Sequence, residues 1–120
     1  MTDLTGRRIL VVEDESLVAM PIETILEDLG CIPVGPAATV PAGLTLATGE
    51  SLDAALLDVN VAGQQVFPVA QALADRGVPL VFSTGYGEAG LPDQWRGRPT
   101  LQKPFTEAAV GQAIRKALGV

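Results

Sequence analysis

The chain has 120 residues, a net charge of −6, and 48% hydrophobic but only 4% aromatic residues, which fits one globular domain with an aliphatic core. Its acidic charge argues against a nucleic-acid-binding surface, and the lack of histidine excludes a histidine-based catalytic triad, a histidine zinc site and a phosphohistidine carrier. Because no apolar stretch is long enough for a signal peptide or a membrane span, we expect a cytoplasmic protein without membrane partners.

Short apolar runs alternate along the chain with stretches of helical periodicity. The runs predict buried strands at 9–12, 31–34, 54–57, 78–82 and 100–102. Apolar residues spaced three and four apart predict helices that begin near Ser16, Thr39, Val66 and Thr106. This alternation implies an α/β fold, a doubly wound parallel sheet with helices on both faces. One domain is expected over residues 6–120, with residues 1–5 as a loose tail.

Prolines and glycines modify this pattern at several places. Pro21 is expected to kink the first helix without ending it, because the apolar stripe continues beyond it. Pro33 cannot donate to a ladder, so its strand is expected at a sheet edge, and Gly35-Pro36 is expected to end that strand. Between Gly85 and Pro99 the chain is rich in Gly and Pro, and at most one helical turn is expected there, at residues 91–95.

Polar residues follow the ends of four predicted strands: Glu13, Asp14, Asp58, Thr84 and Lys103. Ligands bind at the carboxyl edge of open parallel sheets, so these side chains are expected to gather in one site. Carboxylates at close quarters repel one another, and an all-oxygen ligand set suits Mg²⁺ together with a phosphoryl group. Asp58 stands isolated at the end of a buried run, which makes it the expected nucleophile, because carboxylates can form aspartyl phosphates.

Four motifs in this order resemble the receiver domain of two-component response regulators. They are Val11-Val12-Glu13-Asp14-Glu15, Leu56-Leu57-Asp58-Val59-Asn60-Val61, Phe82-Ser83-Thr84-Gly85-Tyr86 and Lys103-Pro104-Phe105. The resemblance covers nearly the whole chain and implies a five-stranded flavodoxin-like sheet of order 2-1-3-4-5. It also implies that Asp58 accepts a phosphoryl group from a phosphohistidine on a sensor histidine kinase.

The resemblance assigns roles to the other motif residues. Asp14 and Asp58 would bind Mg²⁺ directly, together with the backbone carbonyl of Asn60, while Glu13 would act mainly through a metal-bound water. Thr84 would move toward the phosphoryl group and report its arrival.

Two further roles follow from the last motif. Lys103 would pair with a phosphoryl oxygen, and Pro104 would hold the following turn.

Two departures from the family pattern bear on how the signal is read. Many receivers carry an aromatic residue three positions before the lysine, and Thr100 stands there. A full fourth helix is also usual, and residues 87–98 do not predict one. These features resemble the FATGUY receivers, with Ser83 replacing the usual alanine, and this subclass tends to pair with HWE or HisKA_2 kinases. We therefore expect residues 85–99 to change when Thr84 moves.

Several rival functions remain open on the sequence. The chain ends at Val120, soon after the last predicted helix, which favours a stand-alone receiver that switches a downstream partner. It could instead be a phosphate sink or shuttle in a phosphorelay, or a pseudo-receiver that binds partners without phosphate. A flavodoxin-like enzyme or cofactor binder is disfavoured, because Glu13-Asp14-Glu15 follow the first strand where a phosphate-cradling glycine loop would be needed.

Overall fold

A computed structural model describes residues 4–84, 91–103 and 105–120. Its main sheet has five parallel strands in the order β2-β1-β3-β6-β7. These strands are β1 (Arg8–Val12), β2 (Ile32–Ala37), β3 (Ala54–Asp58), β6 (Leu80–Thr84) and β7 (Thr100–Gln102). Counted within this sheet alone, the order is 2-1-3-4-5, which confirms the flavodoxin-like topology predicted from the sequence.

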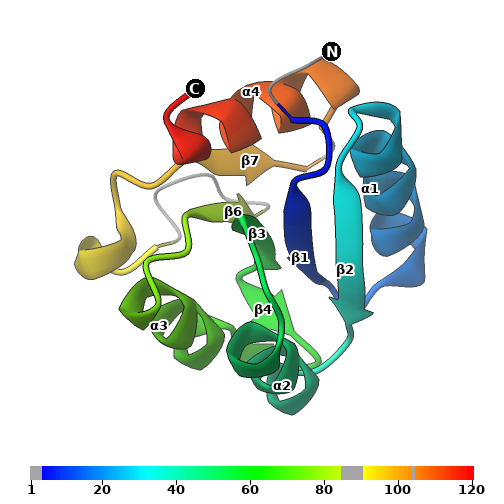
Figure 1. The fold of residues 1–120 in the computed structure, drawn as a ribbon. Helices are drawn as coiled ribbons and strands as arrows, with labels where there is room; N and C mark the ends of the chain where they lie inside the picture. Colours follow the sequence, from blue (N-terminus) through cyan, green and yellow to red (C-terminus); the bar gives the residue numbers. More distant parts are fainter. Residues whose placement is uncertain (1–3, 85–90, 104) are drawn as a thin grey trace.

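In the described part of the chain, four α-helices cover the two faces of the sheet (Figure 1). They are α1 (Ser16–Asp28), α2 (Val40–Gly49), α3 (Phe67–Asp75) and α4 (Glu107–Leu118). Helices α1 and α4 bury their apolar stripes on one face, and α2 and α3 bury theirs on the other. The strands serve both layers because successive side chains alternate: Leu56 belongs to the α1/α4 layer and Leu57 to the α2/α3 layer.

Local sequence signals account for the helix ends. The hydroxyl of Thr39 accepts a hydrogen bond from the Ala42 amide at 3.2 Å, and that of Thr106 accepts one from the Ala109 amide at 3.1 Å. Each hydroxyl satisfies an amide that has no partner inside its helix. Helix α1 runs through Pro21 without ending, as its continuous apolar stripe predicts.

Two sequence predictions at the start of the chain are wrong. The predicted second strand does not end at Gly35-Pro36 but continues to Ala37, with an irregular register against β1. An edge strand tolerates this, since among the described strands β2 pairs with β1 alone and Gly35 adopts a φ of +101°. The predicted loose tail is also partly ordered, because Leu4 is fully buried in the α1/α4 layer and its carbonyl accepts a hydrogen bond from Arg7.

Two small elements complete the described fold. A hairpin joins β4 (Asn60–Val61) to β5 (Gln64–Gln65), and its turn residues Ala62 and Gly63 both have positive φ. Within residues 91–99, one turn of 3-10 helix, η2 (Asp93–Trp95), stands where a one-turn helix was expected. The predictions for residues 85–90 and Pro104 lie outside the described residues. In the described chain, no helix has both the length and the apolar character needed to cross a membrane.

Candidate functional site

The parallel sheet brings together side chains that are far apart in the sequence. Glu13 and Asp14 follow β1, Asp58 and Thr84 end β3 and β6, and Lys103 follows β7. One carboxylate oxygen from each of Glu13, Asp14 and Asp58 lies within 4.8 Å of the others. Glu13 and Asp58 are only 2% and 8% exposed, so two of these three negative charges are held largely away from water.

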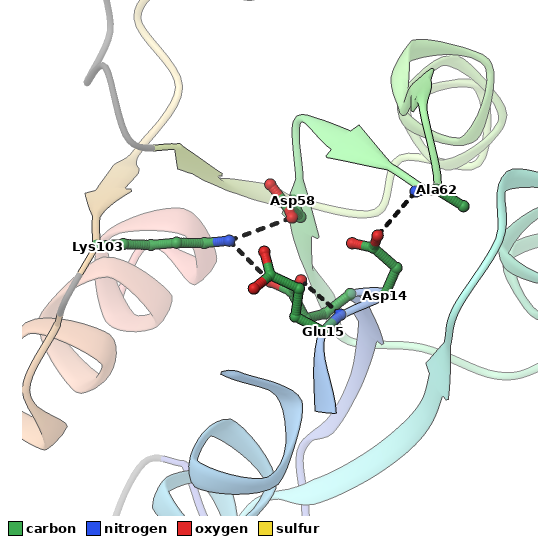
Figure 2. A network of polar contacts seen from close by, with 6 residues as sticks. Asp14, Glu15, Asp58, Ala62 and Lys103 are labelled. Atoms are coloured by element: carbon green, nitrogen blue, oxygen red, sulfur yellow. Dashed lines mark hydrogen bonds and ion pairs between the residues drawn. The ribbon is translucent and has the colours of Figure 1, made fainter. Parts of the chain in front are cut away.

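Lys103 forms the positive side of the site. Its ammonium donates to Glu13 Oε1 at 3.0 Å and to Asp58 Oδ2 at 3.2 Å (Figure 2). Its backbone amide also donates to the Thr84 carbonyl at 3.3 Å, which ties the β7 end to the β6 end. One lysine therefore connects two of the three carboxylates and offsets a single charge.

The pKa values of Glu13 and Lys103 are both raised in this site. Burial, with a smaller contribution from the Asp58 charge, raises the pKa of Glu13 to about 7, although hydrogen bonds from the Glu15 amide and Lys103 lower it in part. Burial by itself would lower the pKa of Lys103, but the hydrogen bond to Glu13 and the charge of Asp58 outweigh it and raise that pKa. Glu13 thus retains a proton nearly to neutral pH, as expected for a carboxyl group whose burial outweighs its hydrogen bonds.

Backbone amides orient two of the carboxylates. The Glu15 amide donates to Glu13 Oε2 at 3.1 Å, and the Ala62 amide donates to Asp14 Oδ2 at 3.1 Å (Figure 2). Ala62 lies in the β4–β5 turn, so Asp14 ties this hairpin to the end of β1. Ala62 was not among the site residues predicted from the sequence, because a backbone donor leaves no residue-type signal. Asn60, whose carbonyl was predicted as a metal ligand, opens β4 two residues after Asp58.

An aromatic cluster lies behind Thr84. Thr84 is 4% exposed and shares a face of β6 with Phe82, two residues earlier. The Trp95 ring packs edge-on against Phe82 at 5.8 Å and stacks on Phe67 at 6.2 Å between ring centroids, and the Arg98 guanidinium lies over the Trp95 ring, 5.5 Å from its centroid. Trp95 is 3% exposed, and its contact with Phe82 packs η2 against β6.

Comparison with known proteins finds similar chains over nearly the full length. The solution structure of SdrG from Sphingomonas melonis is 46% identical, covers all of both chains and superimposes with a TM-score of 0.85. A structure of SdrG titled as its BeF3-activated conformation is 45% identical over 98% of this chain and 99% of that one, with a TM-score of 0.80. The PhyR response regulator REC domain of Erythrobacter litoralis is 27% identical, with a TM-score of 0.86 over 98% of this chain and 94% of that one.

Two further kinds of relative are also similar to this chain: a receiver domain of lower identity and longer curated proteins. The receiver domain of the Pseudomonas aeruginosa sensor kinase PA1611, crystallised with magnesium in its active-site cleft, is 24% identical and shares the fold with a TM-score of 0.83, over 97% of this chain and all of that one. The curated regulator PhyR of Methylorubrum extorquens is 33% identical over 92% of this chain and 43% of its own length. The chain spans about half the length of the curated relatives it matches. No protein-family model matches the chain.

The topology, the acidic edge and these relatives define one class of protein. The chain belongs to the receiver-domain family of response regulators. Within that family it is similar to SdrG over its whole length.

Proposed function

We propose that the protein is a single-domain response regulator whose Asp58 accepts a phosphoryl group from a sensor histidine kinase in a Mg²⁺-dependent reaction. The observation that carries this proposal is the meeting of three carboxylates within 4.8 Å of one another, two of them joined by Lys103. The existence of a BeF3-activated conformation of SdrG supports it. In this role the chain is a signalling phosphoacceptor, not an enzyme that acts on a released substrate.

The donor set fits a hard divalent cation. Glu13, Asp14 and Asp58 supply only oxygen ligands, and the raised pKa of Glu13 reflects burial and repulsion that a divalent charge would offset. Asp14 and Asp58 would hold Mg²⁺ directly with the Asn60 carbonyl, and Glu13 would hold it mainly through water. Bound Mg²⁺ would neutralise charge on the incoming phosphoryl oxygens.

Asp58, Lys103 and Thr84 would each have a separate role in the phosphoryl transfer. The Asp58 carboxylate attacks phosphorus, and the P–N bond of the donor phosphohistidine breaks with its electron pair returning to the imidazole. Lys103 turns from Asp58 Oδ2 toward a phosphoryl oxygen, where its ammonium meets the newly added charge. Thr84 donates its hydroxyl to another phosphoryl oxygen.

A protein donor suits the surface beside Lys103. Lys103 and Phe105 line one side of an open groove of about 390 Å³, and Leu17, Val18 and Pro21 of α1 line the other. Leu17 is 88% exposed, and Met20 is also exposed on this helix. Large exposed apolar side chains next to a reactive site favour a partner that buries them. We infer that the kinase covers this groove during transfer, and the sequence resemblance favours an HWE or HisKA_2 kinase.

Two other functions would use the same fold. A phosphate sink or shuttle would accept phosphate at Asp58 without switching a partner, and a short phosphoryl lifetime or rapid return to the kinase would identify it. A pseudo-receiver would bind its partner without phosphate. The complete set of Asp58, Thr84 and Lys103 at one sheet edge favours phosphoryl chemistry over that alternative.

The deciding experiment is intact-mass measurement after incubation with acetyl phosphate. The wild type is expected to gain one phosphoryl group with Mg²⁺ and none without it. Asp58→Asn should gain none, because the amide is not a nucleophile. Asp28→Asn, an exposed change at the far end of α1, should behave as the wild type. If the wild type binds Mg²⁺ yet is not modified by acetyl phosphate or by its kinase, the pseudo-receiver is the better description.

We further propose that residues 91–99 form the element that reads the phosphorylated state. Thr84 and Phe82 share a face of β6, so movement of Thr84 toward a phosphoryl group disturbs the ring packing between Phe82 and Trp95. Many receivers report phosphorylation through an aromatic residue at the position that Thr100 occupies here. The contact between Phe82 and Trp95 would take over that role. The segment would change its contacts with a downstream partner as a result.

The single tryptophan makes this readout measurable. On addition of BeF3 with Mg²⁺, Trp95 emission is expected to shift to longer wavelength, because the buried indole becomes more hydrated. Asp58→Asn under the same conditions should show no shift. Unchanged Trp95 emission in a wild type that demonstrably binds BeF3 would assign the readout to another segment.

A further inference from the structure

The β4–β5 hairpin begins two residues after Asp58 and is closed by a turn that its sequence does not favour. Ala62 has a φ of +50° and Gly63 a φ of +80°. Hairpin turns with positive φ at both central residues prefer Asn, Asp or Gly at the first of them. Alanine is disfavoured there, because its Cβ crowds the neighbouring carbonyl oxygen. A residue in this conformation is held by contacts with its surroundings, and such residues gather at functional sites.

The hairpin is anchored on the core, which fixes the place of its turn. Val61 and Val66 are both fully buried in the α2/α3 layer. The Val66 amide donates to the Val59 carbonyl at 2.9 Å, which continues the pairing toward β3. Ala62 itself is exposed. Its backbone, and not its methyl group, therefore connects the turn to the rest of the molecule.

The contact that the turn makes is with Asp14. The Ala62 amide donates to Asp14 Oδ2 at 3.1 Å, and the other oxygen of Asp14 lies on the side of Asp58 (Figure 2). Asp14 is exposed, so burial does not fix its carboxylate as it fixes Glu13 and Asp58. Lys103 donates to those two buried carboxylates, and the Ala62 amide donates to the exposed one.

The same hairpin presents the Asn60 carbonyl. Opposed residues in an antiparallel ladder alternate between hydrogen-bonded and non-hydrogen-bonded pairs. The bond from the Val66 amide to the Val59 carbonyl makes the next pair, Asn60 with Gln65, a non-hydrogen-bonded one. The carbonyl of Asn60 thus points away from β5. One hairpin can in this way place two of the proposed magnesium ligands, the Asn60 carbonyl directly and the Asp14 carboxylate through Ala62.

We propose that Ala62 is a positioning residue of the magnesium site, whose backbone amide holds the Asp14 carboxylate in place for the cation. This inference rests on the proposed function. Hydrogen-bond partners of ligating carboxylates orient them and strongly affect metal affinity, although they do not touch the metal. The positive φ of Ala62 then has a role, because the amide meets Asp14 in that conformation.

The test is titration with Mg²⁺ by calorimetry of the wild type, Ala62→Gly and a protein with lactic acid in place of alanine at position 62. Lactic acid keeps the methyl group and turns the amide into an ester, so only the N–H is lost. The ester protein is expected to bind Mg²⁺ about tenfold more weakly. Ala62→Gly keeps the donor and suits positive φ, so its affinity should lie within about twofold of the wild type. The urea midpoint of the Mg²⁺-free ester protein should stay close to that of the wild type, because the lost bond is exposed.

Hydrogen exchange of the Ala62 amide gives a second readout. If this amide favours the metal-binding position of Asp14, bound Mg²⁺ must favour the hydrogen bond to the same extent, since coupling between two binding events is reciprocal. Exchange of the Ala62 amide in the wild type is therefore expected to slow by about tenfold when Mg²⁺ is added. The Arg8 amide is the matched control. It donates to Asp53 Oδ2 at 2.8 Å at the opposite end of β1, and its exchange should not respond.

Several results would overturn the inference. Equal Mg²⁺ affinity in the ester protein and the wild type, or unchanged exchange of the Ala62 amide on Mg²⁺ binding, would contradict it and leave the proposed function standing. A large fall in the urea midpoint of the ester protein would mean that the bond supports the fold and does not position a ligand. If the wild type and Ala62→Gly both fail to bind Mg²⁺, the proposed magnesium dependence itself fails.

Discussion

Replacement of Lys103 with methionine is expected to lower the free energy of unfolding of the Mg²⁺-free protein at pH 8 by about 2 kcal/mol. The change removes the ammonium that donates to both Glu13 and Asp58, and two largely buried carboxylates then face each other without a cation. Methionine keeps an apolar stem in the groove beside Phe105, so the loss reports the charge and not the packing. Urea unfolding measures it directly.

Two controls make the Lys103 result specific. Lys116→Met, on the exposed side of α4, should change stability by less than about 0.5 kcal/mol. Saturating Mg²⁺ should restore most of the stability of Lys103→Met, because the cation offsets the same charges. The loss should also be smaller at pH 5, where Glu13 can take up a proton. A Lys103→Met protein as stable as the wild type at pH 8 would show that the three carboxylates do not need this cation.

The stability of the Mg²⁺-free protein is expected to fall as the pH rises from 4.5 to about 7. Burial raises the pKa of Glu13 from 4.5 to about 7, so over this range the folded state binds a proton that the unfolded state does not. The stabilisation from that proton is complete below pH 4.5 and is lost above pH 7, a change of about 3 kcal/mol. Urea unfolding at pH 5 and pH 8 measures this change.

Glu13→Gln separates this effect from other titrations. The variant cannot ionise at residue 13, so the decline between pH 5 and pH 8 should largely disappear, and its Mg²⁺-free form should be more stable than the wild type at pH 8. Mg²⁺ should stabilise Glu13→Gln less than the wild type, since one negative charge of the site is missing. Glu27→Gln, exposed on α1, should leave the pH profile as it is. Parallel profiles for Glu13→Gln and the wild type would contradict the assignment.

Much of the fold could be predicted because its signals are local. Apolar runs and helical spacing identified the strands and helices of the sheet, and Thr39 and Thr106 marked two helix starts that the structure confirms. Two predictions failed, and both failures have the same cause. Leu4 is buried and β2 continues past Pro36, because packing against a distant layer and pairing at a sheet edge depend on neighbours far away in the sequence.

The residue types at the strand ends predicted a charged site, but not its internal connections. Lys103 donates to Glu13 and Asp58 together, and the Ala62 amide holds Asp14, and neither contact follows from residue type or spacing. The Trp95 contact with Phe82 is likewise a meeting of remote segments.

The sequence by itself determined the class of fold, the order of the elements and the residues that stand at the ends of the parallel strands. Periodicity and capping are properties of neighbours along the chain, so they can be read without coordinates. Only the tertiary structure decided which oxygen meets which donor, how deeply Glu13 is buried, and that Ser83 lies in register with Asp58. Register and burial are set by packing between strands that are tens of residues apart, and the pKa of Glu13 follows from them.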